Sequence, residues 1–85
     1  MKPVEIYTSP FCGYCHAAKR LLKAKGAVFT EHDVARDPSL RAIMMQRSNG
    51  GHTVPQIFIG KTHVGGSDDL HALEKAGKLD ALLAD

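Results

Sequence analysis

The chain has 85 residues, 44% of them hydrophobic and 24% charged, and a formal net charge of +2 with its lysines and arginines scattered along the sequence. This length and composition predict one small globular domain over residues 1–85, and the weak charge gives no reason to expect a nucleic-acid partner. Because no apolar run reaches the length of a secretory signal or the roughly 20 residues that span a membrane, we expect a cytoplasmic protein without a membrane partner.

The first part of the chain predicts a strand followed by a helix. Residues 4–7, which include Val4, Ile6 and Tyr7, are typical of a short strand that breaks at the Thr-Ser-Pro sequence of residues 8–10. Residues 17–25 carry apolar side chains at helical spacing, with basic side chains on the other faces. Gly26 stands where a glycine commonly ends a helix.

The middle of the chain predicts a second strand and a second helix. Residues 27–34 fit a strand that is carried by Val28 and Phe29. Asp37 followed by Pro38 is typical of a helix N-cap with proline at the first helical position. A βαβ unit of this kind implies two parallel strands joined by a right-handed crossover.

The last part of the chain predicts a hairpin and then helix. Residues 55–60 are rich in β-forming side chains, and a Gly-Lys turn leads into a short strand over residues 62–64. Ser67 is placed to cap a third helix that Gly77 ends, and leucines after Gly77 indicate a final short helix. The elements predict an α/β fold in the order β-α-β-α-β-β-α, with or without one extra C-terminal helix. Its sheet is expected to be mixed and four-stranded, with helices on both faces.

The two cysteines of the chain, Cys12 and Cys15, lie one helical turn apart between the first strand and the first helix. A C-x-x-C pair near a βαβ unit is typical of a thioredoxin-like redox motif, in which one thiol attacks a disulfide and the other resolves the mixed disulfide. If Cys12 is the N-cap, free N–H groups and the helix dipole favour its thiolate. We therefore predict Cys12 as the nucleophile and Cys15 as the resolving thiol.

Three other interpretations of the cysteine pair stay open on the residues alone. Two unreactive buried cysteines are one, although a strand-to-helix junction is an unusual place for them. A zinc site would need two further ligands at spacings that the chain lacks, so no metal is expected. The run from Cys12 to His16 also matches the C-x-x-C-H signature of c-type haem attachment, but that chemistry normally accompanies export and no signal is present.

Two further segments narrow the redox interpretation to one family. Thr53-Val54-Pro55 precedes the third strand, and Gly65-Gly66-Ser67-Asp68-Asp69 opens the third helix. With Cys12-Gly13-Tyr14-Cys15, at these separations, the chain resembles a bacterial dithiol glutaredoxin over essentially its whole length. The resemblance implies one glutaredoxin domain over residues 1–85 with the thioredoxin-like fold, acting as a monomer.

The resemblance also implies the reaction and its partners. It implies a glutathione-dependent thiol–disulfide oxidoreductase that reduces protein disulfides and glutathionylated thiols, with glutathione as co-substrate. Ribonucleotide reductase and similar reductases are family examples of protein partners. Cys12 alone is expected to suffice for glutathionylated proteins, whereas protein disulfides require Cys15 as well.

A glutathione site beside the cysteines is the next implication of the resemblance. The Val54-Pro55 bond is expected to be cis, so that the Val54 backbone pairs with glutathione as an added strand would. The start of the third helix is expected to bind the γ-glutamyl carboxylate, with Asp68 at its amino group and Tyr14 as a wall beside the Cys12 sulfur. The expected glutathione-binding residues are Tyr14, Thr53, Val54, Pro55, Gly66, Ser67 and Asp68.

The sequence departs from the common family pattern at Gly13, which replaces a proline, and at Ser9, where many relatives carry lysine. Arg36, Arg41 and His52 are therefore candidates for holding the glycine carboxylate of glutathione.

A flexible Gly13 also leaves open two other functions. One is a [2Fe–2S] cluster bridged by two Cys12 thiolates and two glutathiones in a homodimer, against which Cys15 argues. The other is a redoxin that thioredoxin reductase, not glutathione, reduces.

Overall fold

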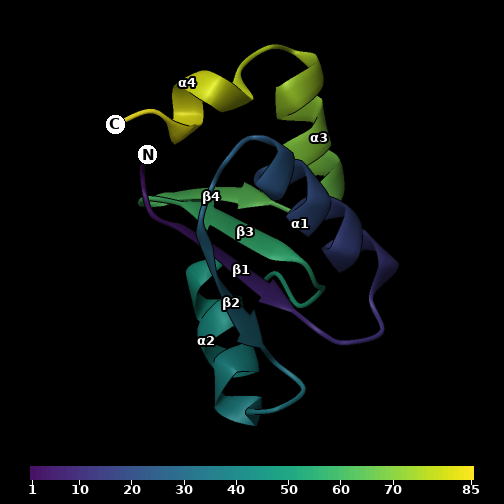
Figure 1. Cartoon of the computed structure of the whole chain (residues 1–85). Coiled ribbons are helices and arrows are strands. Elements are labelled where there is room, and N and C mark those ends of the chain that lie inside the picture. The colour runs from purple at the N-terminus through teal and green to yellow at the C-terminus, as the bar shows by residue number, and fades with distance from the viewer.

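The computed structural model describes all 85 residues, and its elements follow the predicted order, with the final helix present (Figure 1). The elements are β1 (Val4–Thr8), α1 (Gly13–Ala24), β2 (Phe29–Asp33), α2 (Pro38–Arg47), β3 (Gln56–Ile59), β4 (Thr62–Gly65), α3 (Ser67–Lys75) and α4 (Leu79–Leu83). None of the helices has the length and apolar character that crossing a membrane requires.

The four strands form one mixed sheet in the order β2-β1-β3-β4. β1 is parallel to β2, with Val4 opposite Phe29, and antiparallel to β3, with Val4 opposite Ile59. β4 is antiparallel to β3 at the edge of the sheet. The predicted mixed four-stranded sheet is confirmed, and its parallel pair is joined through α1.

Helices cover both faces of this sheet, as predicted. On one face α1, α3 and α4 enclose the larger core, and Figure 1 shows α2 on the opposite side from α1. The larger core consists of Val4, Ile6, Ala18, Leu22, Ala27, Ile57, Ile59, Leu70, Leu79 and Leu83. The smaller core on the α2 side consists of Tyr7, Val34, Met44 and Phe58. Neighbouring residues of β1, Ile6 and Tyr7, thus point to opposite faces.

The predicted helix ends are confirmed at Gly26, Asp37 and Gly77. The Asp37 carboxylate accepts a hydrogen bond from Ser39 N at 3.0 Å and caps α2. Gly26 and Gly77 have φ angles of +75° and +72°, in the left-handed region that favours glycine. After each glycine the next N–H reaches back to a carbonyl five residues earlier, which is the Schellman arrangement.

The second strand begins later than predicted and is not carried by Val28. Ala27 N donates to Leu22 O at 3.0 Å, and this helix-ending bond turns Ala27 into the core. The next side chain, that of Val28, therefore points outward and is 89% exposed. β2 starts at Phe29, which is half-buried.

Ser67 is not the N-cap of α3, contrary to the sequence-based prediction. Gly66 is the N-cap and Ser67 is the first helical residue, buried at 5% exposure. The Asp69 carboxylate accepts a hydrogen bond from Gly66 N at 3.0 Å, so a side chain from within the helix satisfies this N–H. Ser67 Oγ lies 3.3 Å from His71 Nδ1 instead of capping.

Candidate active site

Cys12 is the N-cap of α1, as predicted. Its backbone is extended, with φ −116° and ψ 107°, and helical geometry begins at Gly13. Cys15 N donates a hydrogen bond to Cys12 Sγ at 3.1 Å. The Cys12 sulfur thus sits at the positive end of α1, where an N–H group and the helix dipole both stabilise a negative charge on sulfur.

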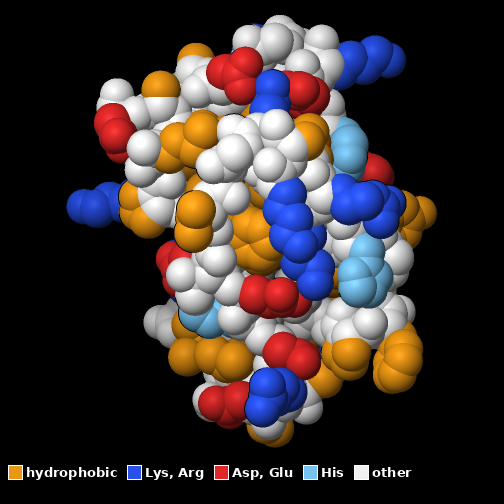
Figure 2. Space-filling view, in the orientation of Figure 1, with side chains coloured by type: hydrophobic (Ala, Val, Ile, Leu, Met, Phe, Trp, Pro, Cys, Tyr) orange, Lys and Arg blue, Asp and Glu red, His pale blue; other side chains and the backbone are white.

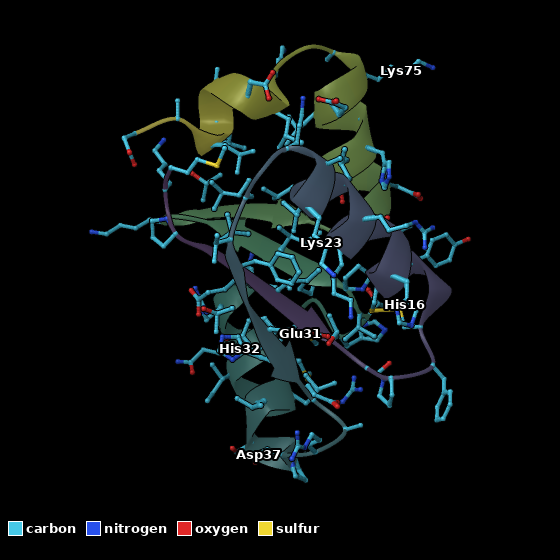
Figure 3. The ribbon with its side chains drawn as sticks, in the orientation of Figure 1. His16, Lys23, Glu31, His32, Asp37 and Lys75 are labelled. Atoms are coloured by element: carbon cyan, nitrogen blue, oxygen red, sulfur yellow. A yellow bond between two sulfur atoms is a disulfide. The ribbon has the colours of Figure 1, made fainter.

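The two cysteines are joined as a disulfide and differ in accessibility. In Figure 3 the yellow bond between the two sulfurs lies beside His16, in the first turn of α1. Cys12 is half-buried at the surface, whereas Cys15 faces the core and has no exposed area. An incoming disulfide can therefore reach the sulfur of Cys12 before that of Cys15.

The Thr53-Val54-Pro55 segment lies against the cysteine pair. The Val54-Pro55 peptide bond is cis, as expected from the resemblance, and Val54 O lies 3.7 Å from Cys12 Sγ. Gly13, between the cysteines, has no atom within 4 Å of the position that a Cβ would take, so this part of the site is open.

A buried glutamine that sequence reasoning missed forms a hydrogen bond to the Thr53-Val54-Pro55 segment. Gln56 is 6% exposed, and its Nε2 donates to Thr53 O at 3.0 Å. Its Oε1 lies 2.6 Å from His63 Nε2 on β4, with the histidine as donor. The pairing of β3 with β4 thereby connects the edge of the sheet to the loop beside Cys12.

A cavity of about 510 Å³ lies between this loop, the start of α3 and Tyr14. It brings together all seven residues that were expected to bind glutathione: Tyr14, Thr53, Val54, Pro55, Gly66, Ser67 and Asp68. Five other residues line it and were not predicted: Gly51, Gln56, His63, Gly65 and Asp69. The candidates for a carboxylate contact, Arg36, Arg41 and His52, do not line this cavity.

One of the residues that were not predicted, Gly65, lines the cavity and leaves room for the side chain of Asp69. It has a φ of +115°, and a Cβ at this position would collide with Asp69 Oδ2. Because glycine leaves this space free, the Asp69 carboxylate can reach Gly66 N and fix the start of α3. The signal for this role was the Gly-Gly pair before two aspartates, which sequence reasoning treated only as a flexible approach.

A polar contact at the end of β1 ties the active-site helix to the sheet. Glu31 on β2 accepts a hydrogen bond from Thr8 Oγ1 at 2.6 Å and from Lys19 Nζ on α1 at 3.0 Å. The Thr8 hydroxyl, followed by the Lys19 ammonium, lowers the pKa of the Glu31 carboxyl. Figure 3 shows Glu31 and the disulfide on the same side of the sheet as α1. No group of three or more His, Cys, Asp or Glu side chains is arranged to hold a metal ion.

Comparison with known proteins decides the family. The family model described as Glutaredoxin matches residues 4–64, well over half of the chain. This chain belongs to the glutaredoxin family. It is 58% identical over 84 residues to the glutaredoxin of Pseudomonas aeruginosa, with 99% of each chain covered. It is 52% identical over 83 residues to glutaredoxin 3 of Escherichia coli, with 98% of this chain and 99% of the relative covered.

Solved glutaredoxins share the same architecture. The solution structure of glutaredoxin from Brucella melitensis is 59% identical, with a TM-score of 0.85, and the match covers 98% of this chain and 89% of that one. The crystal structure of a buckwheat glutaredoxin–glutathione complex is 30% identical, with a TM-score of 0.87, over 96% of this chain and 76% of that one. The predicted thioredoxin-like fold and the predicted class, a thiol–disulfide oxidoreductase, are confirmed.

Proposed function

We propose that this glutaredoxin reduces protein disulfides and glutathionylated thiols, with Cys12 as nucleophile, Cys15 as resolving thiol and glutathione as reductant. The observation that carries the proposal is the N-cap position of Cys12, half-buried and beside Cys15 N, with Cys15 itself fully buried. Position in the helix thus gives the two thiols different reactivities.

The proposed reaction passes through two mixed disulfides. The Cys12 thiolate attacks a substrate disulfide, and one substrate thiolate leaves and takes up a proton. Cys15, losing its proton, attacks the Cys12 sulfur and releases the second substrate thiol, which leaves the Cys12–Cys15 disulfide. One glutathione then forms a mixed disulfide with Cys12 and frees Cys15. A second glutathione attacks the first, so that oxidised glutathione leaves and the dithiol is restored.

We infer that glutathione occupies the cavity beside Tyr14. The Val54 backbone would pair with the tripeptide as an added strand, and the first N–H groups of α3 would bind its γ-glutamyl carboxylate. Asp68 would take the amino group. The proposal is supported by the convergence of the seven expected residues on one cavity and by the likeness to the buckwheat glutaredoxin–glutathione complex.

The finer assignments of place and partner are proposals as well. A catalytic dithiol is typical of a reducing compartment, so we place the protein in the cytoplasm, acting as a monomer on reductases such as ribonucleotide reductase. Nothing in the geometry favours the [2Fe–2S] alternative, because Cys12 faces Cys15 of its own chain.

Two single variants test the roles of the cysteines. Cys12→Ser is expected to lose both reduction of a protein disulfide and release of glutathione from a glutathionylated protein. Cys15→Ser is expected to lose the first reaction and retain the second, because the second needs no resolving thiol. Full release of glutathione by Cys12→Ser would contradict the assignment.

A side-by-side assay tests the reductant. The oxidised protein is mixed either with glutathione and glutathione reductase or with thioredoxin reductase alone, each supplied with NADPH. We expect NADPH consumption in the first mixture to be the faster by far. Faster consumption in the second mixture would show a redoxin that does not use glutathione.

A further inference from the structure

The outward face of α1 carries basic side chains without any acidic one. The helix contains no aspartate and no glutamate. Its basic residues recur three and four positions apart, which places them on one face of the helix. We call this face the α1 basic stripe; it consists of His16, Lys19, Arg20 and Lys23. Three of the eleven lysines and arginines of the chain therefore lie together on one side of α1, and Figure 2 shows blue side chains beside a histidine over α1.

Two charges of the stripe have no acidic partner. Arg20 and Lys23 are exposed and belong to none of the ion pairs of the structure. Lys19, by contrast, lies 3.0 Å from Glu31. Elsewhere Lys25 is neutralised by two acidic neighbours, Glu74 and Asp80. Arg20 and Lys23 are thus unpaired cations on the helix that begins beside the cysteine pair.

The stripe begins at the redox centre. His16 N donates to Cys12 O at 3.2 Å, and Figure 3 shows His16 and Lys23 along the same side of α1. With a rise of about 1.5 Å per residue, Arg20 lies about 12 Å and Lys23 about 16 Å along the helix axis from Cys12. The Debye length is about 10 Å at 0.1 M salt. An extended substrate segment rises about 3.3 Å per residue, so four or five residues beyond a disulfide docked at Cys12 bring its charges within a Debye length of Arg20 and Lys23.

Exposed aromatic side chains lie next to the same centre. Phe11, directly before Cys12, is fully exposed, and Tyr14 is 68% exposed. Aromatic and arginine residues are enriched where proteins bind one another. The surface around Cys12 thus combines exposed aromatic side chains with basic side chains that no acidic residue of α1 offsets. Such a surface is suited to binding a segment of another protein.

We propose that the α1 basic stripe recognises an acidic segment next to the disulfide of a protein substrate. Opposite charges raise the rate of productive encounter and orient the partner, with little effect on the chemistry itself. The inference rests on the proposed reduction of disulfides through Cys12, and it adds the class of protein that is preferred.

A matched pair of double variants tests the stripe. Arg20→Glu with Lys23→Glu reverses its free charges. Lys61→Glu with Lys75→Glu changes the net charge equally, in the turn between β3 and β4 and in the last turn of α3, and both residues are exposed. The prereduced proteins, without glutathione, are mixed with one of two peptides that share the same internal disulfide, flanked either by glutamates or by serines. The readout is the ratio of the rate constants for the acidic and the serine-flanked peptide.

The ratio separates docking from thiolate reactivity, because a changed Cys12 thiolate affects both peptides alike. At low salt we expect the α1 double variant to lower the ratio about tenfold, the control to leave it near the wild-type value, and high salt to remove the difference. An unchanged ratio, or an equal fall in the control, would overturn the proposal. Competition by an RNA oligonucleotide at lower concentration than the acidic peptide would overturn it in favour of a nucleic-acid site. A wild-type protein that reduces neither peptide would instead contradict the proposed function.

Discussion

Cys12 illustrates how one backbone position sets the chemistry of a side chain. Its sulfur accepts a hydrogen bond from Cys15 N at the start of α1, and Val54 O lies 3.7 Å from it. Cys15 is identical in chemistry but is buried three residues further into the helix. The division of labour that we propose therefore depends on where each thiol lies.

Gln56 is predicted to position the cavity that we propose for glutathione, without touching the redox centre. Gln56→Leu removes the donor to Thr53 O, and an unpaired carbonyl costs about 1 kcal/mol or more, so glutathione should bind roughly fivefold more weakly. We expect a raised KM for glutathione in a steady-state assay. The rate of Cys12 alkylation by iodoacetamide should stay the same.

Gln46→Leu is the matched control, since Gln46 is the other glutamine of the chain and is exposed on α2. It should leave the KM for glutathione unchanged. If Gln56→Leu left the KM unchanged as well, the positioning role of Gln56 would be wrong.

The residues of the candidate site that could be predicted from the sequence are those that belong to a local sequence motif. The spacing of Cys12 and Cys15 is itself the motif, and the resemblance supplied the other seven positions. Gln56 and His63 join the site only because β3 pairs with β4, with an irregularity between Ile57 and Phe58. No local pattern marks that pairing, so sequence reasoning could not find them.

At the scale of elements, the attachment of α2 to the sheet depends on one arginine. Arg47, in the last turn of α2, forms two hydrogen bonds to the Glu5 carboxylate and one to Tyr7 Oη. Its guanidinium also stacks over the Phe58 ring at 4.2 Å. This cation therefore joins α2 to β1 and β3 on the smaller core.

The Glu5–Arg47 pair makes stability depend on pH. Hydrogen bonding to Arg47 is the main reason that the pKa of Glu5 lies below its ordinary value of 4.5. A carboxyl with a lowered folded-state pKa adds stability above its unfolded pKa and loses it as the pH falls through the folded pKa. Glu5→Gln should therefore lower the free energy of unfolding at pH 7, by less than about 1 kcal/mol because the pair is partly exposed.

Urea unfolding at pH 7 and at pH 3 measures this effect. As the pH falls through the lowered folded-state pKa of Glu5, the protonated side chain resembles glutamine, so the two proteins should draw closer in stability. A difference that is equally large at both pH values would contradict the assignment to the ion pair.

Element ends were predictable where a single residue type satisfies the backbone, as at Gly26 and Asp37. The N-cap of α3 was wrongly assigned to Ser67 because Gly66 and Ser67 are neighbours and both suit an N-cap. The Asp69 side chain, from within α3, accepts the hydrogen bond of Gly66 N, and Gly66 is the N-cap. Val28 was wrongly expected to carry the second strand. The hydrogen bond from Ala27 N to Leu22 O, which ends α1, turns Ala27 and not Val28 toward the core. Both outcomes depend on contacts outside the local pattern.

At the scale of the whole molecule, α4 closes the larger core and brings the two chain ends together (Figure 1). Leu79 and Leu83 have almost no exposed area, and Lys2 N donates to Leu83 O at 2.8 Å. The N-terminal ammonium also pairs with Asp85 at 3.0 Å. The last helix is therefore part of the folding unit.

Leu83→Ala is expected to lower the free energy of unfolding by about 2–5 kcal/mol, because it opens a cavity in the larger core. Leu82→Ala, on the half-buried side of α4, should cost clearly less. Urea unfolding of the two variants measures the difference. Equal losses would show that α4 packs on the core differently from the arrangement described.

The central claim, that Cys12 is the thiol through which glutathione acts, is tested most directly by trapping the mixed disulfide. Reduced Cys15→Ser is mixed with oxidised glutathione and examined by intact mass and peptide mapping, with reduced Cys12→Ser treated in parallel. We predict one glutathione on Cys12 in the first protein and none on the buried Cys15 in the second. Equally rapid modification of Cys15, or no adduct on Cys12, would contradict the account.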